Sequence, residues 1–263
     1  MNPIDFRYRS PIKIALASYK GGVAKTTSTA AIASCLARRG KSVLAVDMDG
    51  QGDLSSAFQV EPTTNLSTYD AIIQTHNHWP SVYAGNNVSV TPSGPEMETL
   101  LDDLRGVPYL PDIAERMKVK VDYIKGYDYL LFDCPPALNA ITRAAISASD
   151  YVIIPAIPTP MSLKALARTT EYVGLIAGEK STPSVLGILL TMCEPLNLHR
   201  DAIAVIEESF SGLPFKTVIP RTVEMEKMIL RGYSRDPLKR NLGLAAYEAV
   251  TEEIIDRIHN NTQ

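Results

Sequence analysis

Residues 20–27 read Lys-Gly-Gly-Val-Ala-Lys-Thr-Thr, and they closely follow the apolar run Ile12–Ala17. An apolar strand, a glycine-rich turn and a helix that begins near Lys25 are typical of a phosphate-binding loop, because the turn and the helix N-terminus point backbone N–H groups at one spot. Lys25 would contact the β- and γ-phosphates, and the Thr26 hydroxyl would bind Mg²⁺. The standard pattern G-x-x-x-x-G-K-[ST] is incomplete, since its two glycines fall on Tyr19 and Ala24. The alternative is a glycine-rich turn with lysines nearby by chance, and it is weakened by further motifs in the right order.

The composition is that of an ordinary folded protein. The 263 residues carry a net charge of −3, with 45% hydrophobic and 21% charged residues, which fits one α/β domain with a large core. We therefore expect a single domain over residues 1–263, with residues 1–10 as a flexible N-terminal extension. These ten residues are polar and charged, unlike a signal peptide, and no apolar run approaches the roughly 18 residues that a membrane span needs. Three cysteines without the spacing of a metal site indicate a reduced, cytoplasmic compartment.

Short apolar runs rich in β-branched residues alternate with helical patterns along the chain. Several runs are apolar throughout, as strands buried on both faces should be. The expected strands are Ile12–Ala17, Ser42–Val46, Val88–Val90, Tyr129–Phe132, Tyr151–Ile154, Val185–Leu190 and Phe215–Ile219, and the expected helices are Thr26–Arg39, Pro95–Leu104, Pro111–Lys125, Asn139–Ser147, Ser162–Ala177, Arg200–Phe210 and Leu242–Ile258. The alternation predicts an α/β fold with a doubly wound, mostly parallel sheet and helices on both faces. The stretch 59–87 is the least regular, and we expect a surface excursion there.

Two further polar motifs follow expected strands, at the edge where such sheets bind ligands. Asp47 and Asp49 stand in Asp-Met-Asp-Gly-Gln-Gly-Asp at 47–53, where one carboxylate could hold a water of the metal shell and the other could orient a water for attack on phosphorus. A solvated acidic loop is the alternative, since Asp and Gly are common in turns. Asp133 closes the run Tyr129–Phe132 and precedes Cys-Pro-Pro, where a second Mg²⁺ contact is usual. A helix cap is the alternative for Asp133.

Taken together, the three motifs resemble the deviant Walker-motif ATPases of the ParA/MinD family, which are P-loop NTPases. The residues that carry the resemblance are KGGVAKTT at 20–27, DMDGQGD at 47–53 and DCPP at 133–136. The ParA-type branch, which partitions plasmids and chromosomes and positions large cargoes, is the most similar. Weaker similarities follow in the family's order at Ile154-Pro155 with Pro158, at Ile219-Pro220-Arg221, at Leu244–Tyr247 and at Glu252-Glu253-Ile254.

The resemblance implies a switch driven by ATP and Mg²⁺, in which two copies form a homodimer that sandwiches the nucleotides. Lys20 matches the signature lysine that reaches the partner's phosphates, Lys25 matches the phosphate-binding lysine, and Asp49 matches the acid tied to water activation. The residues implied around the metal are Thr26, Asp47 and Asp133. The residues implied at the nucleotide are Lys20, Gly21, Gly22, Val23, Ala24, Lys25, Thr26, Thr27, Pro220 and Arg221. Positive charge supplied by the partner makes hydrolysis depend on assembly.

Two residues depart from the family pattern. Ala24 replaces the usual glycine, and a positive φ there would strain the loop by about 1 kcal/mol, whereas a negative φ would cost little. Gly50 replaces the proline that is common after the second acid, which predicts a looser loop around the nucleotide.

A basic excess in the C-terminal third is the candidate DNA surface. Residues 216–240 hold seven basic and three acidic residues, a local charge of +4 in a chain of net −3. A dimer would double this charge on one face, and contacts with DNA phosphates gain from counterion release. The alternative is a solvated surface, and Glu224 is acidic where many relatives have a basic residue that contacts DNA. The candidate DNA-binding residues are Lys216, Arg221, Lys227, Arg231, Arg235, Lys239 and Arg240.

The expected function is that of a weak ATPase, stimulated by DNA and by a ParB-like or small basic adaptor protein. In its ATP state it would bind DNA non-specifically and partition or position DNA or a large cargo on the nucleoid. The alternative is a nucleotide-gated regulator that docks a protein partner without DNA. We expect no membrane partner, because the tail 256–263 is short, polar and not basic, unlike a MinD-type amphipathic anchor. A metal-cluster relative would need a cysteine pair that Cys134 and Cys193 do not provide, and His76-x-His78 lacks further metal ligands nearby.

Overall fold

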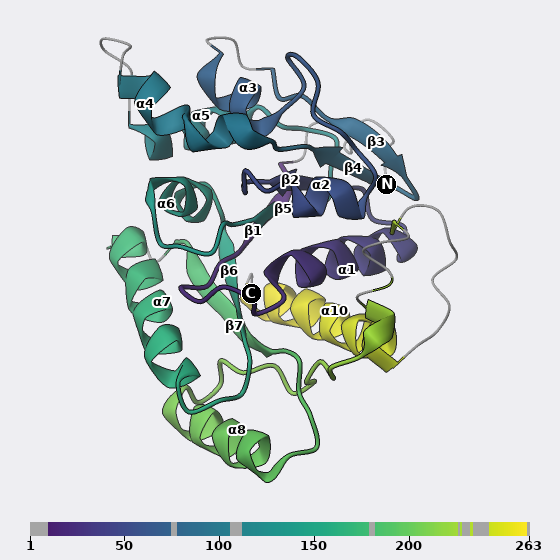
Figure 1. The fold of residues 1–263 in the computed structure, drawn as a ribbon, viewed down its shortest axis with the longest axis vertical. Helices are drawn as coiled ribbons and strands as arrows, with labels where there is room; N and C mark the ends of the chain where they lie inside the picture. Colours follow the sequence, from purple (N-terminus) through teal and green to yellow (C-terminus); the bar gives the residue numbers. More distant parts are fainter. Residues whose placement is uncertain are drawn as a thin grey trace.

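The computed structural model has a central sheet with helices packed against it (Figure 1). The residues that it describes are 10–74, 78–105, 112–178, 182–225, 227, 232–233 and 242–261. Within these residues seven strands form one sheet in the order β3-β4-β2-β5-β1-β6-β7, with all neighbours parallel except β3 and β4. The strands are β1 (Ile12–Leu16), β2 (Val43–Asp47), β3 (Val82–Gly85), β4 (Val88–Thr91), β5 (Tyr129–Asp133), β6 (Tyr151–Ala156) and β7 (Ser184–Leu190). Because β1 lies inside the sheet and later strands are added on both sides of it, the predicted doubly wound, mostly parallel sheet is confirmed.

Helices cover both faces of the sheet (Figure 1). On one face α1 and α10 lie side by side and share a buried cluster with Leu16 and Leu131. On the other face α5, α6 and α7 share a second cluster with Ala15 and Leu130. Neighbouring strand residues thus enter opposite clusters, which explains why the strands read as continuous apolar runs. The helices are α1 (Lys25–Arg38), α2 (Asp53–Ala57), α3 (Thr68–Ile73), α4 (Leu100–Arg105), α5 (Ile113–Asp122), α6 (Ala140–Ser147), α7 (Ser162–Ala177), α8 (Asn197–Ser209) and α10 (Leu242–Asn261), with a short 3₁₀ helix at Pro95–Glu98.

The expected strand at Phe215–Ile219 is wrong. Isolated bridges at the two flanking prolines join this segment to β7 and to the chain just after it. Proline has no N–H with which to extend a ladder. The N–H groups of Lys216 and Thr217 donate instead to the Glu253 carboxylate of α10, at 2.8 and 2.9 Å. Two N–H groups of the segment therefore bind a side chain of α10, whereas those of Phe215 and Ile219 donate to carbonyl oxygens of β7.

The described part of the stretch 59–87 is more ordered than the expected surface excursion. It contains α3, whose N-terminus is closed by a capping box between Ser67 and Asp70, and β3 at the sheet edge. Trp79 is buried, and its indole N–H donates to Thr91 Oγ1 at 2.9 Å. A helix of six residues and a strand of four are too short to show a clear period in the sequence. His76 lies outside the described residues, which contain no group of three or more metal-ligating side chains.

Other predicted elements are present with shifted ends. The expected helix Pro95–Leu104 is divided into the 3₁₀ helix and α4, and the helix expected from Pro111 to Lys125 is shorter as α5. The predicted N-terminal extension lies outside the described residues apart from Ser10.

Candidate active site

Three loops with charged residues leave the sheet at the same edge. The parallel register pairs Leu16 of β1 and Asp47 of β2 with Asp133 of β5. Residues 18–24, here called the phosphate loop, follow β1 and therefore start beside both carboxylates. Three motifs that are far apart in the sequence meet at this edge.

The phosphate loop ends in a left-handed backbone conformation. Gly22 has φ 68°, which glycine adopts freely, and Ala24 has φ 59° and ψ 36°. The positive φ at Ala24 therefore carries a strain of about 1 kcal/mol. Ala24 is the N-cap of α1 and provides no side-chain cap, so the N–H groups of the first helical turn stay available to an anion.

Lys25 folds back under the phosphate loop. Its side chain is buried, and its Nζ lies 3.4 Å from the carbonyl oxygen of Lys20. Burial lowers the pKa of Lys25, and the nearby Asp133 charge acts in the opposite direction. Lys20 itself is half-buried, and the described residues provide no partner for its ammonium group. Lys25 thus lies buried beneath the phosphate loop, and Lys20 lies half-buried at its rim.

Asp133 is bound by two threonine hydroxyls of α1. Thr26 Oγ1 donates to Asp133 Oδ2 at 2.7 Å, and Thr29 Oγ1 donates to Asp133 Oδ1 at 3.1 Å. Burial, together with the Asp47 charge, raises the pKa of Asp133 to about 8. Because the Thr26 hydroxyl uses its hydrogen as a donor to Asp133, the lone pairs of its oxygen remain for a cation.

Asp47 is held within its own loop. Asp47 Oδ2 accepts from the N–H and the hydroxyl of Ser55 at 2.9 and 2.6 Å, and Oδ1 accepts from Asp49 N at 3.2 Å. Burial raises the pKa of Asp47 to about 6. The Ser55 hydroxyl in turn accepts from Ser93 N at 3.0 Å. Since both oxygens of Asp47 are engaged, its carboxylate would reach a metal through water, and it fixes the loop that carries Asp49.

These donors fit a magnesium ion that binds together with a nucleotide. Mg²⁺ takes few carboxylates, keeps waters and relies on substrate phosphates. The site offers the Thr26 hydroxyl with Asp133 and Asp47 close by, whereas the described residues contain no cluster of three or more acidic, histidine or cysteine ligands that would hold a metal alone. The donor set therefore needs phosphate oxygens to complete it.

The loop after β2 packs closely on the segment after β4. Asp49 is half-exposed, and its Oδ1 accepts from Gln51 N at 3.2 Å. A Cβ added at Gly50 would stand 3.4 Å from the carbonyl oxygen of Gly94. Gly52 has φ 69°, and a Cβ there would be only 3.0 Å from the carbonyl oxygen of Ser93. This packing limits the looseness expected from Gly50.

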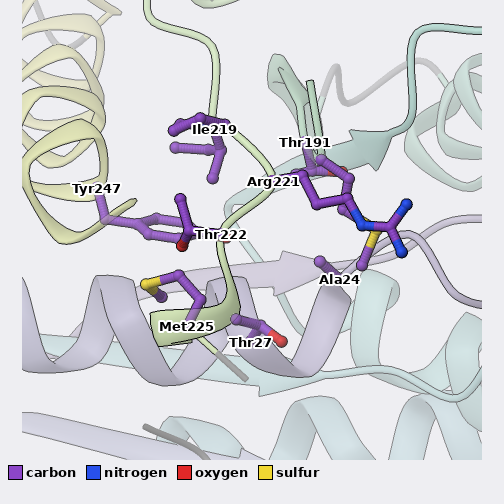
Figure 2. Close-up of a pocket in the computed structure, with 10 residues that line it drawn as sticks. Ala24, Thr27, Thr191, Ile219, Arg221, Thr222, Met225 and Tyr247 are labelled. Carbon is purple, nitrogen blue, oxygen red and sulfur yellow. The ribbon is translucent and has the colours of Figure 1, made fainter. Parts of the chain in front are cut away.

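A small pocket adjoins the phosphate loop on the side of α10 (Figure 2). Thr191 Oγ1 donates to the carbonyl oxygen of Val23 at 3.1 Å, which joins the end of β7 to the loop. Thr222 Oγ1 is buried and has no partner among the described residues. The free volume is about 40 Å³. The pocket is lined by Ala24, Thr27, Thr191, Met192, Ile219, Pro220, Arg221, Thr222, Met225 and Tyr247.

Comparison with known proteins places the chain in a family. The family model described as an AAA domain matches residues 12–185. The sporulation initiation inhibitor protein Soj of Bacillus subtilis is 31% identical over 252 residues, which are 92% of this chain and 97% of that protein. The chromosome-partitioning ATPase Soj of Thermus thermophilus is 31% identical over 251 residues, which are 94% of this chain and 96% of that protein. The chain belongs to the ParA/MinD family of P-loop ATPases.

A solved structure shares the fold of this ParA-type ATPase at lower sequence identity. Cobyrinic acid a,c-diamide synthase from Mycobacterium smegmatis, with bound ADP and magnesium, has a TM-score of 0.79 and is 22% identical. The match covers 95% of this chain and 96% of that one. The P-loop NTPase fold predicted from the sequence is thus confirmed.

The candidate DNA residues of this ParA-type ATPase are only partly described. Lys216, Arg221 and Lys227 are exposed, and the Arg221 guanidinium lies 3.7 Å from the Glu194 carboxylate. The role of the basic excess in DNA binding stays a prediction. No helix among the described residues is long and apolar enough to cross a membrane. Four of the predicted residues lie outside the described ones, namely Arg231, Arg235, Lys239 and Arg240.

Sequence analysis missed the residues that support the site rather than form it. Ser55 and Ser93 hold Asp47 and its loop, but no spacing rule connects them to an acid in another motif. Thr191 could have been found, because it is a polar residue directly after the apolar run Val185–Leu190, at the same edge of the sheet.

Proposed function

We propose that this ParA-type ATPase, acting as one domain over residues 1–263, binds ATP with Mg²⁺, dimerises around the nucleotides and hydrolyses ATP slowly. One observation carries the proposal: the buried Lys25 and the Thr26–Asp133 contact lie beneath a helix N-terminus that has no side-chain cap. Backbone N–H groups of the first turn would bind phosphate, and Lys25 would offset its charge. Pro220 and Arg221 line the pocket beside the loop, where the base would lie.

Hydrolysis needs a water and positive charge placed at the γ-phosphate. Mg²⁺, when bound, supplies charge compensation for the phosphate oxygens. Thr26, oriented by Asp133, would bind the metal, and the half-exposed Asp49 would orient the attacking water. Lys20 at the rim would reach the partner's phosphates, so that full activity depends on assembly.

We further propose that the ATP dimer binds DNA non-specifically and partitions or positions DNA or a large cargo on the nucleoid, in the cytoplasm. An adaptor protein, ParB-like or small and basic, would stimulate hydrolysis. The support is the chromosome-partitioning relative from Thermus thermophilus and the local charge of +4 at residues 216–240, where three basic side chains are exposed. A dimer would present two such patches.

DNA retention with ATP and with ADP, each at low and high salt, tests this proposal. We expect retention with ATP alone, a steep loss with salt and no preference for base sequence. Replacing Arg231, Arg235 and Arg240 by Glu should abolish retention but leave ATP binding and dimerisation intact. The control replaces three exposed basic residues outside the patch by Glu, namely Lys125, Lys164 and Arg200, with the same change of charge.

Retention that is equal in ADP, or unchanged in the patch variant, would mean that the patch is a solvated surface. The nucleotide-gated regulator that docks a protein partner would then be the better function. The ion pair between Arg221 and Glu194 favours this second candidate, because it engages one of the cations that DNA would need.

A further inference from the structure

Tyr19, the second residue of the phosphate loop, contacts α7 through both its backbone and its ring. Tyr19 N donates to Thr169 Oγ1 at 3.2 Å, and the Arg168 guanidinium carbon lies 5.0 Å from the centroid of the Tyr19 ring. Thr169 is fully buried, and its hydroxyl donates to the carbonyl oxygen of Ala165 at 2.8 Å, so the acceptor is itself fixed in α7. Both the backbone and the ring of Tyr19 are therefore tied to one helix.

This contact lies directly before Lys20. The Lys20 N–H donates to Ser18 Oγ at 3.4 Å, and the Lys20 carbonyl oxygen accepts from Lys25 Nζ at 3.4 Å. The backbone of Lys20 is thus fixed by its neighbours, and α7 fixes the residue that precedes it. The standard phosphate-loop pattern has a glycine at the position of Tyr19, which could not offer a ring to another helix.

We propose that Arg168 and Thr169 are positioning residues that, through Tyr19, hold Lys20 in the direction it needs to act across the dimer. The proposal rests on the role given to Lys20 in the proposed function. A lysine side chain has four rotatable bonds, so the direction of its backbone decides how often the ammonium reaches its target. Small misplacements of a catalytic group lower the rate strongly, even when binding is intact.

Paired variants at positions 168 and 19 test whether the contact between Arg168 and the Tyr19 ring supports catalysis. Arg168→Gln and Tyr19→Leu should lower the ATPase kcat about two- to fivefold, the range of an exposed cation–π contact. Their affinity for ADP should equal that of the wild type, because the nucleotide contacts of the monomer are untouched. Arg168→Lys and Tyr19→Phe keep a cation and a ring and should restore kcat. The charge control is Lys164→Gln, which removes an exposed cation one turn earlier on α7 and should leave kcat unchanged.

A double-mutant cycle shows whether Arg168 acts through Lys20. Arg168→Gln should cause no further loss of kcat, and no further weakening of the dimer formed with a non-hydrolysable ATP analogue, in the Lys20→Ala background. A further loss in that background, a matched loss of ADP affinity, or failure of the conservative variants to restore kcat would overturn the positioning role.

The two proposals fail in different ways. Wild-type hydrolysis by Lys20→Ala would overturn the role of Lys20 and with it the proposed mechanism. If Lys20→Ala hydrolyses ATP slowly but Arg168→Gln keeps the wild-type kcat, only the positioning role of α7 is overturned.

Discussion

The two ends of the candidate nucleotide site are built in different ways. At the phosphate end, the partners lie at the carboxyl ends of neighbouring parallel strands, where Lys25 contacts the Lys20 carbonyl oxygen of the phosphate loop and Thr26 donates to Asp133 at the end of β5. At the other end, residues 214–225, here called the base segment, form no strand of the sheet and take their partners from α10 and β7. Glu253 of α10 binds two of its N–H groups, and Ile219 N donates to the carbonyl oxygen of Leu190 at 2.8 Å.

Because of this difference, variants at the two ends should affect different quantities, namely ligand affinity at one end and the free energy of unfolding at the other. A variant at the phosphate end removes a group that faces the ligand, while the sheet edge that carries it stays packed on both faces. A variant at the base end releases a segment whose backbone depends on α10. We therefore expect the first kind to change affinity at nearly constant stability, and the second kind to change stability first.

The largest effect is expected for Lys25→Ala at the phosphate end. The buried ammonium that faces the loop is lost, so the ATP affinity measured by calorimetry should fall about 100-fold or more. The free energy of unfolding without nucleotide should not fall, because a buried cation is removed along with its desolvation cost. Lys41→Ala, beyond the end of α1, is the matched control and should bind ATP as the wild type does. Tight ATP binding by Lys25→Ala would falsify the phosphate-loop assignment.

The next effect is expected at the base end, for Glu253→Ala. The N–H groups of Lys216 and Thr217 lose their acceptor, so the free energy of unfolding in urea should fall by about 1–2 kcal/mol. Asp256→Ala, exposed on the same helix, should unfold as the wild type does. If Glu253→Ala is as stable as the wild type, Glu253 contributes no stability to the base segment and the contrast between the two ends is lost.

A smaller effect at the phosphate end concerns the metal. Thr26→Val keeps the shape of the side chain but removes its oxygen, so the affinity for Mg²⁺–ATP should fall about tenfold. The affinity measured with EDTA should stay constant, and Thr26→Ser should restore the Mg²⁺ dependence. An equal loss with and without Mg²⁺ would show that Thr26 contacts the nucleotide rather than the metal.

The phosphate end could be predicted from the sequence although Thr26 and Asp133 stand 107 residues apart in the chain. Each motif follows an apolar strand, and parallel strands bring their ends to one edge, so the sequence predicts that Thr26 and Asp133 lie together, as the structure confirms. The support of Asp47 by Ser55 and Ser93 was not found, because it depends on how two loops fold against each other.

The base end could be predicted only in part. Pro220 and Arg221 follow from the family resemblance, and both line the pocket. The strand expected at Phe215–Ile219 is absent, because an apolar pattern reports burial and not the identity of the backbone partner, which for Lys216 and Thr217 is Glu253. The sign of φ at Ala24 could not be predicted for a similar reason. Alanine is compatible with either sign, and the conformation of the surrounding loop determines which one it adopts.

Ala24 belongs to both ends, since it is the last residue of the phosphate loop and also lines the pocket (Figure 2). The smallest expected effect is the change in the free energy of unfolding when Ala24 is replaced by glycine. Ala24→Gly relieves about 1 kcal/mol of strain at φ 59°, but the unfolded chain gains about 0.4–1 kcal/mol of conformational entropy, so the net stabilisation in urea should be small. Ala24→Val adds a β-branched side chain to the left-handed conformation and should destabilise.

Ala167→Gly, inside α7, is the control for an alanine with ordinary helical backbone and should cost about 1 kcal/mol. A loss of that size for Ala24→Gly would contradict the left-handed conformation. The N–H groups of the first turn of α1 would then point elsewhere, and the anion site at the phosphate end would lose its geometric basis.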